Sequence, residues 1–158
     1  MKLVISSIIL FLFYAESFAQ CQSPVFSYKD TSFVVGATVT RRNISFSDPC
    51  QAKLSPNSKK ALDSIYRFLV KNPQMKIEVG VHAGRPCYKC GSCANPTQNG
   101  ADAIKDYLVK KGIEKRRIAA TGYGQTMPVS QLSTGAKTSV IDEKLNTRIE
   151  FKITYNKL

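Results

Sequence analysis

Three of the five cysteines in this chain recur at a spacing of three residues, as Cys87, Cys90 and Cys93. Thiols so spaced support three kinds of chemistry. They pair as disulfides in an oxidising compartment, bind zinc as thiolates, or exchange disulfides as a redox pair. Cys50 or the single histidine, His82, would complete a four-ligand zinc site.

The N-terminus indicates that these cysteines are exported. A positive end precedes an apolar run over residues 3–14, and a small-x-small site follows at residues 17–19. This order is typical of a secretory signal peptide. We therefore expect a signal peptide over residues 1–19, an N-terminal lead over residues 20–32 and one domain over residues 33–158.

Export favours the disulfide among the three thiol chemistries, because thiols in an oxidising compartment pair before they bind metal. A redox Cys-x-x-Cys opens a helix, whereas Pro96 and Gly100 are expected to lie between these cysteines and the next helix. We predict no metal and no cofactor. Five cysteines cannot all pair within one chain. Cys21 is compatible with lipidation, although Gln20 is a poor residue to precede a lipidated cysteine.

No catalytic arrangement is visible in the sequence. A lone histidine at a strand end, such as His82, is more often a hydrogen-bonded structural residue than a base or a ligand. There is no Ser/His/Asp spacing and no pair of carboxylates within one loop. Gly122-x-Gly124 follows a strand, but no helical pattern follows it, so it is not a nucleotide loop. We predict that the protein is not an enzyme.

The formal net charge of +12 indicates anionic partners. A basic exported protein attracts lipid phosphates, cell-wall carboxylates or an acidic protein surface over a long range. Nucleic acid is not expected, because an exported chain rarely meets it. The alternative is that the charge only keeps the surface solvated.

The elements that position these residues follow from the apolar periodicity. Alternation predicts extended segments, and a 3.6-residue period predicts two helices. The first begins at Ser55-Pro56 and ends at Asn72-Pro73, and the second ends at Gly112. Strands are expected over residues 33–47, 75–82, 117–121 and 148–155, helices over 56–71 and 101–111, and loops over 83–100 and 122–142. The order β-α-β-α-β-β predicts an α/β fold, an α+β sandwich with both helices on one face of a mixed sheet.

From about Phe33 to Tyr155 the chain resembles the OmpA-like, or MotB-like, peptidoglycan-binding domain. The most specific pieces are Gly122-Tyr123-Gly124 with Pro128, and the Asn-Thr-Arg-Ile-Glu-Phe run at residues 146–151. Weaker pieces in the same order are Ala61-Leu62-Asp63, Asn72-Pro73, Tyr107-Leu108, Lys111-Gly112-Ile113 and Arg117-Ile118. The resemblance implies the fold predicted above and a non-enzymatic role in the periplasm or at the outer membrane.

The resemblance also implies a ligand, the zwitterionic diaminopimelate of peptidoglycan. In the family, the aspartate of a Gly-His-Thr-Asp motif binds its ammonium and an arginine of a Leu-Ser-x-x-Arg-Ala motif binds its carboxylate. Here His82 is kept, but Ala83 and Gly84 occupy the Thr and Asp positions, and the arginine falls on Asn99 or Gly100. With both charges missing, we expect a dead or altered pocket.

The family fold also places the loop of Cys50 beside that of Cys87, Cys90 and Cys93, so the resemblance implies a disulfide between the two loops. Three functions remain open. The first is an envelope module that binds a protein partner, through which it could also associate with a membrane. The second is weak peptidoglycan binding through basic charge, and the third is a zinc or redox protein.

Overall fold

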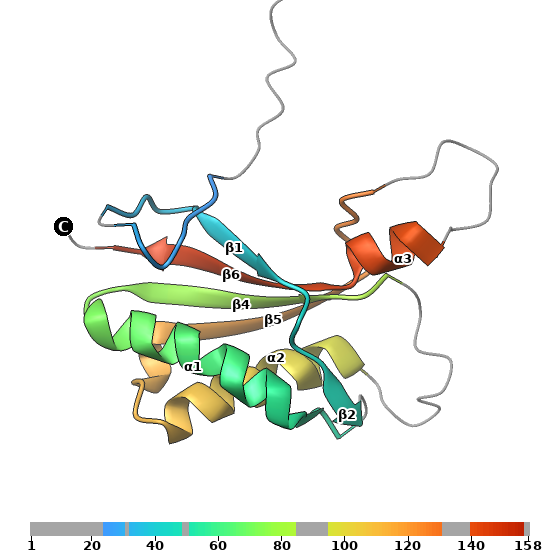
Figure 1. Ribbon diagram of the computed structural model, residues 1–158, viewed down its shortest axis with the longest axis horizontal. Helices are drawn as coiled ribbons and strands as arrows, with labels where there is room; N and C mark the ends of the chain where they lie inside the picture. The colour runs from blue at the N-terminus through green and yellow to red at the C-terminus, as the bar shows by residue number, and fades with distance from the viewer. Residues whose placement is uncertain (1–23, 31, 49–50, 85–94, 131–139, 157–158) are drawn as a thin grey trace, which may run out of the picture.

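The computed structural model describes residues 24–30, 32–48, 51–84, 95–130 and 140–156. Its main sheet has four strands in the order β1-β6-β4-β5, and a second sheet pairs β2 with β3 (Figure 1). The strands are β1 (Thr38–Arg41), β2 (Phe46–Asp48), β3 (Lys53–Leu54), β4 (Lys76–His82), β5 (Ile118–Gly124) and β6 (Arg148–Tyr155). The main sheet is mixed, because β4 runs parallel to β5 and antiparallel to β6.

Two long helices cover one face of this sheet, as Figure 1 shows. The helical segments are α1 (Pro56–Lys71), α2 (Pro96–Lys110), the 3-10 turn η1 (Lys115–Arg117) and α3 (Val140–Asn146). The predicted β-α-β-α-β-β order and the placement of both helices on one face are confirmed. In the described part of the chain, no helix is long and apolar enough to cross a membrane.

Local sequence sets the bounds of α1. The side chain of Ser55 accepts a hydrogen bond from the Ser58 backbone N–H, and Pro56 occupies the first turn. At the other end, the backbone N–H and the side-chain amide of Asn72 both donate to the Phe68 carbonyl. The predicted start and end of this helix are therefore confirmed.

The core lies between the helices and the covered face of the sheet. Alternate residues of β4 and β6 are buried there, among them Ile77, Val79, Phe151 and Ile153. Because neighbouring residues of a strand point to opposite faces, the intervening positions of β4 and β6 lie on the open face. The open face carries the polar residues described below.

One buried charge ties three elements together at the amino end of β4. The guanidinium of Arg117 donates to the carbonyl oxygens of Leu69, Asn72 and Met75 at 2.7–2.9 Å. These carbonyls belong to the last turn of α1 and to the residues that connect it to β4. Arg117 therefore fastens the start of β5 to that turn, satisfying acceptors that the helix end leaves unpaired.

The structure corrects several predicted boundaries. α2 begins at Pro96, not at residue 101, because Asn95 caps it by accepting from the Gln98 backbone N–H. Pro96 and Gly100 were expected to precede this helix, but both lie within it, and Pro96 is its first residue. β5 continues to Gly124 instead of ending at residue 121.

Three short elements were not predicted. α3 has seven residues, η1 three and β3 two, so their apolar patterns are too short to show a period. The extended segment predicted over residues 33–47 forms two separate strands, β1 and β2. The first of them begins only at Thr38, after a turn in which Gly36 adopts a φ of 92°.

Candidate functional site

The residues that the sequence singled out gather where β4 and β5 end and α2 begins. His82 is the last residue of β4. Beyond it, the Ala83 N–H donates to the Gly124 carbonyl at 2.7 Å, and the Gly84 N–H donates to the Thr147 hydroxyl at 3.0 Å. Ala83 and Gly84 thus lie between the end of β5 and the start of β6.

Gly84 packs directly against the backbone of α3. A Cβ atom built on Gly84 would lie 2.1 Å from the carbonyl oxygen of Glu143 and 2.6 Å from its Cα. No real Cβ contact is that short, and a backbone cannot give way as a long side chain can. Position 84 therefore has no room for any side chain while α3 occupies this place.

The space beside Gly100, one of the two candidate arginine positions, is also occupied by a residue of another element. Gly100 is buried in α2, and a Cβ atom built on it would lie 3.0 Å from the ring of Phe46 in β2. Asn99, the other candidate, is exposed in the same helical turn. The structure thus sets an aromatic ring against Gly100, whereas Asn99 faces solvent.

The first turn of α2 seals the free edge of β5. The side-chain amide of Gln98 accepts from the Gly122 N–H at 2.8 Å and donates to the Ala120 carbonyl at 3.2 Å. The Gly124 N–H donates to the hydroxyl of Thr97. Gln98 therefore takes the place of a neighbouring strand, which protects an edge that could otherwise pair with another chain. Gly122 permits this approach, because a Cβ there would lie 2.2 Å from the Gln98 nitrogen.

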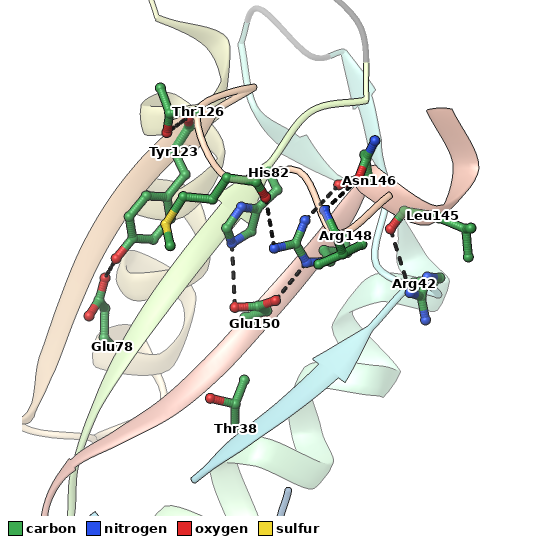
Figure 2. Close-up of polar contacts among 12 residues, drawn as sticks. Thr38, Arg42, Glu78, His82, Tyr123, Thr126, Leu145, Asn146, Arg148 and Glu150 are labelled. Carbon is green, nitrogen blue, oxygen red and sulfur yellow. Dashed lines mark hydrogen bonds and ion pairs between the residues drawn. The ribbon is translucent and has the colours of Figure 1, made fainter. Parts of the chain in front are cut away.

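A polar cluster occupies the open face beside these positions (Figure 2). The rings of His82 and Tyr123 stack at a centroid distance of 4.8 Å. Tyr123 is the extra residue of a bulge in β5, since Val81 pairs with Gly122 and His82 with Gly124. The bulge turns the ring of Tyr123 across the end of β4.

The hydroxyl of Tyr123 donates to Glu78 at 2.5 Å. This bond to a carboxylate, together with burial, raises the pKa of Tyr123 to about 12. The tyrosine is therefore held in its neutral form as a hydrogen-bond donor.

Glu150 of β6 joins the other side of the cluster. Its two oxygens lie 3.5 Å from His82 Nε2 and 2.6 Å from Arg148 Nε (Figure 2). The imidazole and then the guanidinium lower the pKa of Glu150 to about 2. Glu150 is therefore an ionised carboxylate that is already engaged by two partners, which suits a structural ion pair better than a proton-transfer group.

Arg148 extends the cluster to the loop after β5. Its guanidinium donates to the carbonyl oxygens of Asn146 and Met127 at 3.2 Å. The side-chain oxygen of Asn146 accepts from the N–H groups of Val129 and Ser130. The Asn-x-Arg pair at residues 146 and 148 thus clamps this loop against the end of α3, and among the described contacts its role is positional.

His82 was the one member of this cluster that the sequence identified. It is 3% exposed, its Nε2 lies 3.5 Å from Glu150, and among the described residues neither ring nitrogen has a well-formed hydrogen bond. Tyr123, Arg148 and Glu150 lie in the two motifs that carry the family resemblance, but neither they nor Glu78 were predicted as site residues. The alternation of β4 and β6 indicates which of their residues share the open face. Only the pairing register, in which His82 lies opposite Arg148, brings these residues together.

The cysteine predictions fall elsewhere. Cys21, Cys50, Cys87, Cys90 and Cys93 lie outside the described residues. Within the ranges that the structure describes, no group of three or more His, Cys, Asp or Glu side chains is placed to hold a metal ion.

Comparison with known proteins agrees with this architecture. The sequence profile of the OmpA family matches residues 48–141. The chain is 31% identical to outer membrane porin F of Pseudomonas fluorescens over 63% of its own length and 29% of that protein. It is 34% identical to outer membrane protein P5 of Haemophilus influenzae over 51% of its length and 22% of that protein. The matched part thus spans less than a third of these relatives.

Solved structures show the same fold. A MotB-like protein from Desulfovibrio vulgaris superposes with a TM-score of 0.62 and 20% identity, over 77% of this chain and 74% of that one. The cell wall anchor of the type VI secretion system from Pseudomonas aeruginosa superposes with a TM-score of 0.60 and 23% identity, over 73% and 79% of the two chains.

Proposed function

The chain belongs to the OmpA family, and from this premise we propose that it is a non-enzymatic domain of the cell envelope whose family ligand pocket is closed. The observation that carries the proposal is the packing at Gly84, where the backbone of α3 fills the space of a side chain. The ring of Phe46 against Gly100 supports it at the second motif.

The energetics of the lost contacts support the same conclusion. A hydrogen bond to a charged group contributes about 1.5–3 kcal/mol, so losing two weakens binding by roughly 100-fold or more. Binding of a zwitterionic peptide would in addition require α3 to move away from Gly84. The polar cluster around Glu150 does not replace the lost groups, because His82 and Arg148 already engage its carboxylate.

We propose that this domain binds another protein of the cell envelope. Both curated relatives described above are named as outer membrane proteins, and the chain has the fold of their family. A domain that keeps the fold and closes the pocket retains its outer surface for protein contacts. Association with a membrane could then follow through that partner.

Weak retention on peptidoglycan is the second candidate function, and it is favoured by the net charge of +12. Attraction between basic side chains and wall carboxylates needs no pocket. It is screened within about 8–10 Å at physiological salt, so it should be released by a moderate salt wash.

The test of the closed pocket is binding to purified sacculi and to a soluble diaminopimelate muropeptide. We expect sacculi to retain the protein only at low salt, and the muropeptide to bind at least roughly 100-fold more weakly than it binds an OmpA-like domain that carries both motif charges. Salt-resistant retention, or muropeptide affinity equal to that of the control domain, would refute the closed pocket.

The disulfide between Cys50 and the cluster of Cys87, Cys90 and Cys93 remains part of the proposal. Closing such a loop would stabilise the fold by about 2–4 kcal/mol. Because α2 begins at Pro96, that proline and Gly100 do not separate Cys93 from the next helix in sequence. The redox alternative therefore also needs a test. Thiol counting and metal analysis on exported protein distinguish a disulfide from zinc or from a redox pair.

A further inference from the structure

The end of the molecule opposite the candidate site gathers exposed cations from separate elements. The helices end there, η1 follows α2, and β4 begins (Figure 1). We call the exposed cations at these positions the basic end: Lys71, Lys76, Lys110, Lys115 and Arg116.

Hydrogen bonds made by Arg117 hold the basic end together. Arg117 donates to the carbonyls of Leu69, Asn72 and Met75, so η1 lies against the residues on either side of Lys71 and Lys76. Every member of the basic end is therefore a sequence neighbour of this junction or of the last turn of α2. The surface is built by the fold and is not a run of charges in the sequence.

The charge of this surface is poorly compensated by the described residues around it. Glu114 is the acid in η1's vicinity, and it is paired with Arg116 at 2.6 Å in an exposed ion pair. Asp106 lies one helical turn before Lys110 in α2. Five cations and two acids still leave a local excess of positive charge. Such a surface attracts a polyanionic partner.

Apolar side chains at the same end indicate which kind of partner. Val70, next to Lys71 in α1, is 53% exposed, and Tyr155 at the end of β6 is 42% exposed. Lys76 pairs with Tyr155 across the strands and places its ammonium 5.1 Å from the tyrosine ring. Val34 and Val35 are also exposed, in the turn whose Gly36 N–H donates to the Ile153 carbonyl in β6.

We propose that the basic end docks on the surface of a bilayer that contains anionic phospholipids. Lysines attract the phosphate layer, while exposed valines and an interfacial tyrosine enter the boundary between head groups and acyl chains. A soluble polyanion such as the wall polymer would use the cations but gain nothing from Val70 or Tyr155. The surface is separate from the closed pocket and does not depend on the function proposed above.

The test measures co-sedimentation of the full chain with vesicles of phosphatidylethanolamine containing phosphatidylglycerol, and with vesicles of phosphatidylcholine alone. We expect binding to the anionic vesicles only. A triple variant, Lys71→Gln, Lys76→Gln and Lys115→Gln, should bind on the order of 100-fold more weakly, since each cation near an anionic surface contributes roughly five-fold.

The matched control removes the same charge from the other end of the molecule, through Lys53→Gln, Lys60→Gln and Lys144→Gln. These lysines are exposed in β3, at the start of α1 and in α3. The control should bind like the parent. Both variants keep the same N-terminal residues, so any contribution of those residues to vesicle binding is equal in the two. Equal losses in the two variants, or equal binding to neutral and anionic vesicles, would overturn the proposal.

A variant that conserves every charge separates a bilayer from a soluble polyanion. Val70→Ser should weaken vesicle binding by about three-fold and leave retention on sacculi unchanged, because only a bilayer buries the valine. Thermal unfolding checks that each variant is folded. If Val70→Ser binds vesicles like the parent, or if the lysine triple variant loses only sacculus retention, the occupant is a polyanion and the bilayer proposal fails.

Discussion

Tyr123 shows how one residue can be fixed by two different contacts. Its ring stacks on His82, and its hydroxyl donates to Glu78 from a bulge that the neighbouring strand does not share. The hydrogen bond to a carboxylate explains why the pKa of Tyr123 rises to about 12. The two contacts tie the bulge of β5 to two residues of β4.

The Tyr123→Phe substitution keeps the stacked ring and removes the hydroxyl. We expect the free energy of unfolding at pH 7 to fall by about 1 kcal/mol, the low end for a charged acceptor because the tyrosine is half-exposed. Urea unfolding followed by circular dichroism measures this change.

The same variant gives a pH dependence with a definite sign. The pKa of Tyr123 is raised in the folded state above the ordinary value of 10.0, so its contribution is present below pH 10 and is lost as the pH rises toward 12. The stability difference between parent and Tyr123→Phe should therefore shrink over that interval. A difference that stays constant from pH 9 to about 12 would contradict the assigned hydrogen bond.

At the scale of elements, α3 and β2 occupy the space beside Gly84 and Gly100 by different means. The backbone of Glu143 lies against Gly84, whereas a side chain that can rotate, Phe46, lies against Gly100. A backbone cannot shift without moving its whole helix, but a ring at 3.0 Å needs to move only a few tenths of an ångström. The two glycines should therefore respond differently to an added methyl group.

We expect Gly84→Ala to lower the free energy of unfolding by about 1–3 kcal/mol, as overpacking does. Gly100→Ala should be close to neutral, because an alanine gains about 1 kcal/mol of helix propensity that offsets the shift of the ring. Denaturant unfolding of the pair tests this. If Gly84→Ala is as stable as the parent, α3 does not close this position in solution, and the closed pocket loses its main support.

At the scale of the whole molecule, the two ends have different compositions. One end carries Gly84, Gly100 and the His82 cluster, and the other carries the basic end around Arg117. Arg117 makes the second end possible, because its three bonds join α1, β4 and β5 at one junction. Burial lowers the pKa of this guanidinium, which nevertheless stays charged.

Arg117→Ala should therefore destabilise the entire fold. Three carbonyl oxygens would lose a charged donor, which we expect to lower the free energy of unfolding by at least about 3 kcal/mol. Arg116→Ala is the matched control, since that side chain is 81% exposed and should change stability by about 0.5 kcal/mol or less. Thermal and urea unfolding of both variants would measure the contrast, and equal effects would refute the role of Arg117.

The sequence by itself determined the long elements and the family. Ser55-Pro56, Asn72-Pro73 and the alternation of Ile77 and Val79 report local conformational preferences, which neighbouring residues decide. A capping residue followed by proline, as at Ser55-Pro56, also occurs at Asn95-Pro96, so the start of α2 was predictable too. The absence of an ionisable side chain at Gly84, Asn99 and Gly100 is likewise a matter of residue identity.

Only the tertiary structure decided what occupies the space beside those glycines. Glu143 lies 59 positions from Gly84 and Phe46 lies 54 from Gly100, and no local pattern links such distant residues. The cluster of His82, Tyr123 and Glu150 and the basic end arise in the same way. Strand register and helix packing set them, because burial of the core fixes which distant segments become neighbours.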